Sequence, residues 1–165
     1  MTKTHKSIAA ALTLGAAAVG AGLGLQQPAA PEALAISDNV QASFLRANIN
    51  NKFVSSENGS NNGMNCNRNS AGSWELFSVE LVDGEWSLCG NNKKFVSSEN
   101  GNRSMRCNRN GVGAWEKFEL VSLPDRAYAL KGNNGKFVSS EDGRQPMRCN
   151  RNGIGTWETF FVSNF

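Results

Sequence analysis

The sequence predicts an all-β domain of three pseudo-threefold-symmetric repeats, because three short motifs recur in the same order at nearly equal spacing. Lys-Phe-Val-Ser-Ser-Glu begins at residues 52, 94 and 136, Cys-Asn-Arg-Asn at 66, 107 and 149, and Trp-Glu-x-Phe at 74, 115 and 157. The phenylalanines of the first motif, Phe53, Phe95 and Phe137, lie 42 residues apart. A fixed period of this length indicates a repeat architecture.

Within a repeat, short apolar clusters alternate with glycine, asparagine, aspartate and serine, which is typical of strands joined by tight turns. In the third repeat we expect strands at 127–131, 136–140, 147–150 and 156–162. No part of the domain longer than a turn has a helical pattern. A propeller has a similar period but usually closes with about four to eight blades. Three four-stranded repeats of about 42 residues instead fit a β-trefoil, a six-stranded barrel capped by three hairpins.

Residues 1–35 have the order of a secretory signal peptide. Lys3 and Lys6 precede an uncharged run at 7–25, and small residues stand at Ala33 and Ala35. We expect cleavage after Ala35, with Ala30 as the alternative position. The uncharged run is also long enough for a transmembrane anchor, but its alanines and glycines make it weakly hydrophobic. We therefore expect a secreted, extracellular protein with no membrane insertion after cleavage.

Residues 36–165 are then expected to form a single domain, with repeats at about 40–82, 83–123 and 124–165. The whole chain has 17 basic and 14 acidic residues, and removing Lys3, Lys6 and Glu32 leaves 15 and 13, a net charge of +2. This balance favours neither nucleic acid nor an anionic membrane as partner. The single histidine, His5, lies in the predicted signal peptide.

The motifs also carry a resemblance to a known family. At Gly-Lys-Phe-Val-Ser-Ser-Glu (135–141), Met-Arg-Cys-Asn-Arg (147–151) and Gly-Thr-Trp-Glu-Thr-Phe (155–160), the chain resembles the fascin-like β-trefoil family, and the likeness recurs over 43–165. Members of that family serve as actin-bundling domains in animal cells or as sugar-binding modules in bacterial secreted proteins. Some of the bacterial modules look like trivalent β-glucan binders that use a tryptophan and a glutamate in each repeat. Ricin-type trefoil lectins carry Gln-x-Trp repeats, which this chain lacks.

The Trp-Glu pairs are the leading candidates for a binding site. The phenylalanine of each Trp-Glu-x-Phe alternates with an apolar residue two positions later, so a continuous strand would turn the tryptophan outward. An indole suits the C–H face of a sugar ring, and a carboxylate accepts hydrogen bonds from hydroxyls; packing under a neighbouring hairpin is the alternative. The candidates are Trp74, Glu75, Trp115, Glu116, Trp157 and Glu158. Secondary candidates are Arg68, Arg109 and Arg151, whose motif could instead form turns, and we expect Ser-Ser-Glu to be structural.

The first repeat departs from the other two. Ser70 stands where the others have Gly111 and Gly153, the turn at 58–63 has one extra residue, and Ser43 replaces Trp86 and Tyr128. We therefore expect the first site to be the most altered.

The four cysteines predict at most one disulfide. Cys66, Cys107 and Cys149 occupy equivalent repeat positions, which leaves Cys89 as the natural partner of Cys66 or Cys107. The absence of histidine and of close cysteine spacing predicts no metal site, and we expect no cofactor.

The sequence argues against an enzyme. Without histidine, residues 36–165 cannot activate a nucleophile through a Ser-His or Cys-His pair, and the equivalent glutamates belong to separate repeats. We expect a non-catalytic, lectin-like monomer with up to three shallow sites for polysaccharide or glycan. The alternatives are a protein-interaction module, either actin-bundling or inhibiting an extracellular enzyme, and an envelope protein without a ligand.

Overall fold

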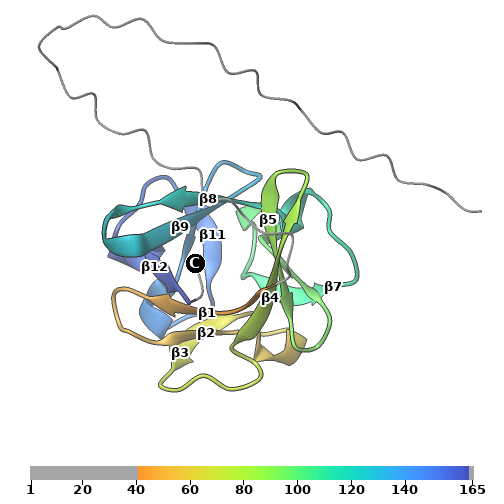
Figure 1. The fold of residues 1–165 in the computed structure, drawn as a ribbon, viewed down its shortest axis with the longest axis horizontal. Helices are drawn as coiled ribbons and strands as arrows, with labels where there is room; N and C mark the ends of the chain where they lie inside the picture. Colours follow the sequence, from red (N-terminus) through yellow and green to blue (C-terminus); the bar gives the residue numbers. More distant parts are fainter. Residues whose placement is uncertain (1–40, 164–165) are drawn as a thin grey trace, which may run out of the picture. The chain divides into compact units, whose positions relative to one another are not determined.

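The computed structural model describes residues 41–163, which form short strands joined by turns (Figure 1). The strands are β1 (Gln41–Ala47), β2 (Phe53–Ser55), β3 (Asn65–Arg68), β4 (Leu76–Val82), β5 (Glu85–Gly90), β6 (Phe95–Ser97), β7 (Arg106–Arg109), β8 (Phe118–Ser122), β9 (Ala127–Gly132), β10 (Phe137–Ser139), β11 (Arg148–Arg151) and β12 (Phe160–Val162). One-turn 3-10 helices lie between them: η1 (Glu57–Gly59), η2 (Glu99–Gly101), η3 (Ala114–Glu116), η4 (Pro124–Arg126), η5 (Glu141–Gly143) and η6 (Thr156–Glu158). The prediction of an all-β domain is confirmed.

Six of the strands close into a barrel. β1 pairs with β4 and β12, β5 pairs with β4 and β8, and β9 pairs with β8 and β12, all antiparallel. The hairpins β4–β5 and β8–β9 stand out in green and teal in Figure 1. Because the ring of pairings is closed, the barrel has no free edge strand. The predicted six-stranded barrel is therefore present.

The other six strands form the hairpins β2–β3, β6–β7 and β10–β11. The first strand of each hairpin also pairs with a barrel strand: β2 with β1, β6 with β5 and β10 with β9. Each short turn of the Ser-Ser-Glu motif then contacts a strand from a different hairpin: η1 lies against β7, η2 against β11, and η5 against β3. The hairpins are thus joined to one another in a ring.

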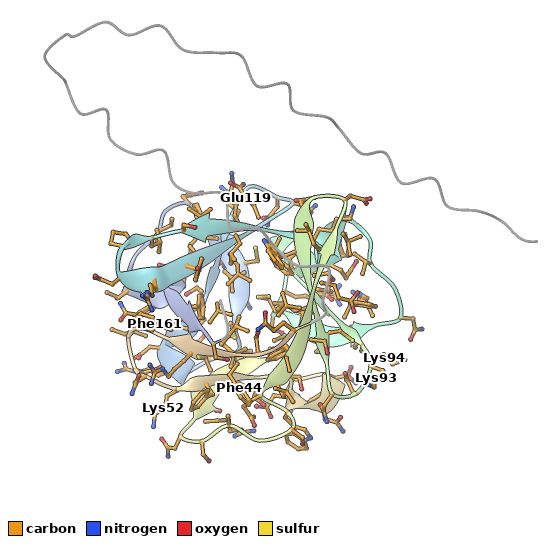
Figure 2. The ribbon with its side chains drawn as sticks, viewed as in Figure 1. Phe44, Lys52, Lys93, Lys94, Glu119 and Phe161 are labelled. Atoms are coloured by element: carbon orange, nitrogen blue, oxygen red, sulfur yellow. The ribbon has the colours of Figure 1, made fainter. Side chains whose placement is uncertain are left out.

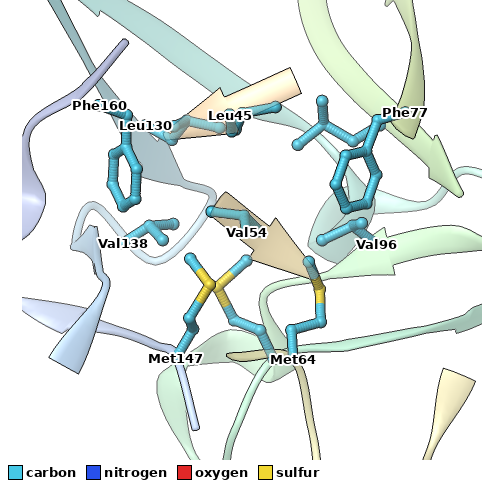
Figure 3. A pocket seen from close by; sticks show the side chains of 11 residues that line it. Leu45, Val54, Met64, Phe77, Val96, Leu130, Val138, Met147 and Phe160 are labelled. Carbon is cyan, nitrogen blue, oxygen red and sulfur yellow. The ribbon is translucent and has the colours of Figure 1, made fainter. Parts of the chain in front are cut away.

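The core is shared by the barrel and the three hairpins and consists of equivalent apolar residues from the three parts of the chain. Phe77, Phe118 and Phe160 are fully buried, as the alternation in Trp-Glu-x-Phe predicted. Val54, Val96 and Val138 pack beneath them, together with Met64, Met105 and Met147 (Figure 3). The three methionines also form a closed ring of backbone hydrogen bonds of 2.9 Å, from Met64 N to Met105 O, Met105 N to Met147 O, and Met147 N to Met64 O.

Two of the four strands expected in the third repeat are shorter in the structure. The strand expected at 136–140 spans only Phe137–Ser139. The sequence predicts a strand over 156–162, but only Phe160–Val162 is extended, and Thr156–Glu158 forms η6. The reason is a local cap: the Glu158 carboxylate accepts a hydrogen bond from the backbone N–H of Gly155 at 3.0 Å, which closes a tight turn.

The predicted disulfide between Cys89 and Cys66 or Cys107 is not formed: within 41–163 all four cysteines are free thiols. A Cβ added to Gly90 would lie 2.6 Å from the Cys107 sulfur. Because neighbouring residues of a strand point to opposite faces, Cys89 points away from that sulfur. Each buried thiol instead donates to a backbone carbonyl, with Sγ···O distances of 3.1–3.3 Å for Cys66 to Lys52, Cys107 to Lys94 and Cys149 to Lys136.

The predicted signal peptide, residues 1–35, lies outside the described residues. Among residues 41–163, no helix has the length and apolar character needed to cross a membrane.

Candidate functional site

The tryptophan of each Trp-Glu-x-Phe motif is exposed although the phenylalanine three positions later is fully buried. The exposed fractions are 41% for Trp74, 41% for Trp115 and 38% for Trp157. The backbone at each tryptophan is fixed, since its carbonyl accepts a 2.8 Å hydrogen bond from the second serine of Ser-Ser-Glu, at Ser56, Ser98 and Ser140. Within residues 41–163, none of these three indole nitrogens donates a hydrogen bond. Each indole therefore offers a flat apolar face and an N–H group to a ligand.

The glutamate that follows each tryptophan is buried, in contrast to its neighbour. In the second repeat, Glu116 is 6% exposed, and its Oε2 accepts a 2.9 Å hydrogen bond from Gly113 N. Its other oxygen lies 3.6 Å from Nε of Arg109. Glu75 and Glu158 have the equivalent partners at Gly72 and Arg68 and at Gly155 and Arg151. Both oxygens of each carboxylate thus have partners inside the protein.

The secondary candidates Arg68, Arg109 and Arg151 each bridge two glutamates. In the second repeat, Nη2 of Arg109 lies 2.5 Å from the Glu99 carboxylate, while Nε faces Glu116. The corresponding distances are 2.8 Å for Arg68 to Glu57 and 2.7 Å for Arg151 to Glu141. Each arginine with its two glutamates is called an arginine cluster below. The side chain of each arginine is 37–38% exposed, so part of it faces solvent.

Sequence reasoning missed the first glutamate of each arginine cluster. Glu57, Glu99 and Glu141 end Ser-Ser-Glu, and each precedes its arginine by ten or eleven residues in the sequence. That nearly equal spacing was the available signal, but the pairing depends on an unusual turn. These glutamates adopt left-handed φ values of 49°, 51° and 51°, a conformation that costs a non-glycine residue about 1–3 kcal/mol. The turn is held by serine hydroxyls, as in Ser97 Oγ, which accepts from Glu99 N at 3.2 Å.

The charged groups at each arginine cluster nearly balance one another. The Arg151 guanidinium carbon lies 6.0 Å from the centre of the Trp157 ring, within the range of a cation–π contact. A lysine also stands near the arginine cluster in each repeat: Lys52, Lys94 and Lys136 donate to the side-chain oxygens of Asn69, Asn110 and Asn152. Lys52 and Lys94 project from separate places on the edge of the domain (Figure 2). The arginine, the lysine and the two glutamates of each repeat sum to no net charge, and Arg103 adds one positive charge in the second repeat.

The rim of each cluster differs between repeats even though the cluster itself does not. Arg103 lies 3.7 Å from Glu99 in the second repeat, and Arg144 lies 3.0 Å from Asp142 in the third. The first repeat has Ser60 and a longer turn in this region. The first repeat keeps its arginine cluster and exposed tryptophan, and its longer turn changes the rim of the candidate site, whereas Ser43 is fully buried in β1.

Two cavities in the core are separate from this site. One is lined by the phenylalanines, valines and methionines of the core (Figure 3), and the other by Leu45, Val79, Trp86, Leu88, Leu120, Leu130 and Val162. Their linings are side chains of apolar residues, so they offer no group for acid–base chemistry. Among residues 41–163, no cluster of three or more histidine, cysteine, aspartate or glutamate residues is arranged to hold a metal.

No protein-family model and no curated protein matches the chain. Among solved structures, the chain is similar to the designed 3-fold symmetric protein ThreeFoil, with 20% identity, 75% of this chain and 99% of that chain covered, and a TM-score of 0.64. It is similar to SeviL bound to asialo-GM1 saccharide, at 10% identity, 75% and 97% coverage and a TM-score of 0.61. It is also similar to the Macrolepiota procera ricin B-like lectin in complex with lactose, at 9% identity, 77% and 96% coverage and a TM-score of 0.64.

These likenesses, together with the closed barrel and its three hairpins, show that the chain has the β-trefoil fold. Glycosidases are also among the similar structures, and the chain covers 32% and 30% of two of them. All of these identities are low, so they establish the fold and leave the activity to be argued from the site.

Proposed function

We propose that this chain is a secreted, non-catalytic, lectin-like protein that binds carbohydrate at up to three equivalent shallow sites, one on each four-stranded repeat. The observation that carries the proposal is the exposure of Trp74, Trp115 and Trp157, each of which is followed by a buried glutamate that faces a partly exposed arginine. Two proteins of the same fold were solved with saccharides, asialo-GM1 saccharide and lactose. We also propose membership of the fascin-like family, on the motifs that recur through the chain.

In each site the roles follow from exposure. The indole face packs against the C–H face of a sugar ring, and the indole N–H and the arginine N–H groups donate to its hydroxyls. The buried glutamates hold the guanidinium, because a carboxylate paired with arginine makes strong, directional hydrogen bonds. Glu75, Glu116 and Glu158 therefore act mainly through the arginine, whereas the sequence had also offered them as candidates for direct contact with sugar hydroxyls.

The proposed ligand is a polysaccharide of the β-glucan type, as the family resemblance implies. Each proposed site has one exposed aromatic ring, so a single site binds weakly. Three sites on one rigid domain raise the apparent affinity for a polymer through effective concentration. Binding to insoluble polymer should therefore exceed binding to the corresponding monosaccharide.

A retention assay on insoluble β-glucan, chitin, xylan and mannan tests the proposal. The single variants Trp74→Ala, Trp115→Ala and Trp157→Ala should each reduce retention, and the triple variant should abolish it. Leu81→Ala is the matched control, because Leu81 is a comparably exposed apolar residue in the β4–β5 hairpin, outside the three arginine clusters. Its retention should stay unchanged.

Thermal unfolding of the same variants separates binding from folding. Loss of retention with an unchanged melting temperature supports the sites. Full retention by the triple tryptophan variant, or equal binding of monosaccharide and polymer, would show that the proposal is wrong.

A further inference from the structure

Six asparagines between residues 41 and 163 are followed directly by glycine, and the structure divides them into two kinds. The asparagines are Asn58, Asn62, Asn100, Asn110, Asn134 and Asn152. In four of the six pairs the glycine N–H donates a backbone hydrogen bond of 2.9–3.2 Å, and the glycine has a left-handed φ of 72–92°. These four glycines are Gly59, Gly63, Gly101 and Gly135. Their nitrogens are committed to tight turns.

Gly111 and Gly153 belong to the second kind. Within residues 41–163, neither of their nitrogens donates a hydrogen bond, and both glycines lie in exposed bends with no left-handed φ. A Cβ added to either would meet no atom within 4 Å. The preceding Asn110 and Asn152 are exposed as well. These two segments therefore have the space to change conformation.

A lysine ammonium group also hydrogen-bonds to the side-chain amide of Asn110 and of Asn152. Lys94 Nζ donates to Oδ1 of Asn110, and Lys136 Nζ donates to Oδ1 of Asn152. A cation at a carbonyl oxygen stabilises the negative charge that develops there when a nucleophile adds to the carbonyl carbon. The lysines thus favour attack on the amide carbon of these two side chains.

We propose that Asn110 and Asn152 are sites of spontaneous deamidation. The lone pair of the Gly111 nitrogen adds to Cγ of Asn110, its proton passes to a solvent base, and the bond from Cγ to Nδ2 breaks as that nitrogen takes a proton from water and leaves as ammonia. Water then opens the resulting cyclic imide at either carbonyl, which gives aspartate or isoaspartate. The net change consumes one water and releases one ammonia, without oxidation or reduction. Gly153 attacks Asn152 in the same way.

The first repeat contains a built-in comparison. Asn69 accepts the same hydrogen bond, from Lys52, but Ser70 follows it in place of glycine. The serine Cβ restricts the backbone and crowds the ring closure that glycine permits. We expect Asn110 and Asn152 to react roughly tenfold faster than Asn69, which corresponds to a barrier lower by about 1.4 kcal/mol.

The modification has a consequence for binding that rests on the proposed function. Isoaspartate adds one carbon to the backbone between Arg109 and Trp115, and likewise between Arg151 and Trp157. On ageing, the second and third sites should weaken while the first is preserved, so retention on insoluble β-glucan should fall towards that of a chain with one intact site.

Peptide mapping by mass spectrometry tests the proposal without reference to any ligand. The chain is incubated at mildly alkaline pH, sampled over time, and digested with trypsin. Because Arg68, Arg109 and Arg151 precede the three asparagines, each asparagine begins its own tryptic peptide. We expect conversion to aspartate and isoaspartate at Asn110 and Asn152 first, well ahead of Asn69 and of the four hydrogen-bonded pairs.

Two substitutions, each at the residue that follows the asparagine, make the test specific. Gly111→Ser should slow the reaction at Asn110 to the rate at Asn69 and leave Asn152 unchanged as the reference, and Ser70→Gly should accelerate Asn69 to the rate at Asn110. The open space around Gly111 allows its variant to fold. Equal rates at Asn69, Asn110 and Asn152, or faster reaction at the four hydrogen-bonded pairs, would overturn the proposal.

Discussion

Replacing Gly101 with alanine tests how rigidly the hairpins are held against one another. Gly101 ends η2, which lies against β11, and has a φ of +75°. An added Cβ would lie 2.5 Å from the carbonyl oxygen of Cys149 and 2.6 Å from Nδ2 of Asn134. Both are closer than a carbon atom can approach. Since the Cys149 oxygen belongs to the backbone of the neighbouring hairpin, relief requires one hairpin to move.

The expected loss of stability has two parts. A left-handed conformation costs a residue with a Cβ about 1–2 kcal/mol, and forcing extra atoms into a packed region costs about 1–3 kcal/mol. Gly101→Ala should therefore lower the free energy of unfolding by about 2–5 kcal/mol. This is a large share of the total stability of a typical domain, about 5–15 kcal/mol.

Substitutions at two other glycines separate the conformational cost from the packing cost. Gly135 has a φ of +72° and open space around its Cα, so Gly135→Ala should show the conformational cost alone, about 1–2 kcal/mol. Gly111 has neither constraint, so Gly111→Ala should be neutral or stabilise by up to about 1 kcal/mol. Urea unfolding monitored by tryptophan fluorescence measures all three. If Gly101→Ala costs no more than Gly135→Ala, the contact between η2 and β11 yields easily and the reasoning is wrong.

Three further predictions follow from the buried groups. A thiol reagent should label only Cys89 in the folded chain and all four cysteines after unfolding, because the other three are fully buried and donate to backbone carbonyls. Burial raises the pKa of Cys66, Cys107 and Cys149 from 9.0 to about 11. These thiols therefore ionise at a lower pH in the unfolded chain than in the folded one. The stability that the protonated thiols contribute should be fully present below pH 9, and the free energy of unfolding should fall by about 2–3 kcal/mol per thiol as the pH approaches 11. Urea titrations of Cys107→Ala should show a smaller fall over the same pH range. Glu116→Ala should destabilise by about 1–3 kcal/mol because it leaves Gly113 N without an acceptor and Arg109 with Glu99 as its remaining carboxylate. Glu119→Ala, which removes an exposed ion pair with Lys131, should cost less than about 1 kcal/mol in the same assay.

The parts of the fold that depend on local pattern were predictable from the sequence. The alternation around Phe118 placed that residue in the core, and the spacing of apolar clusters located the hairpins. The shortened strand before Phe160 was not predictable, because the alternation rule assumes an extended backbone and the Glu158 cap turns it. The tryptophan nevertheless remained exposed, for a different reason from the one the sequence suggested.

The links between residues far apart in the sequence were harder to predict. The pairing of Arg109 with Glu99 depends on a left-handed glutamate that no propensity favours. The disulfide prediction failed for a related reason, because counting equivalent cysteines says nothing of which face of β5 carries the Cys89 side chain. Both cases require knowledge of backbone direction at one residue, which a repeat pattern does not contain.

Repetition by itself does not show function, since a motif can recur three times because the fold requires it. The structure supplies such a reason for most of the repeated residues. The serines hold the left-handed turn, the cysteines fill the core, and the arginine and its two glutamates bind one another. The tryptophan differs from these residues. Its backbone carbonyl is used by the fold, but any residue has a backbone carbonyl, and its indole side chain is exposed. Among the repeated residues, the fold therefore accounts least for the identity of Trp74, Trp115 and Trp157, and for that reason the first experiments should address these three.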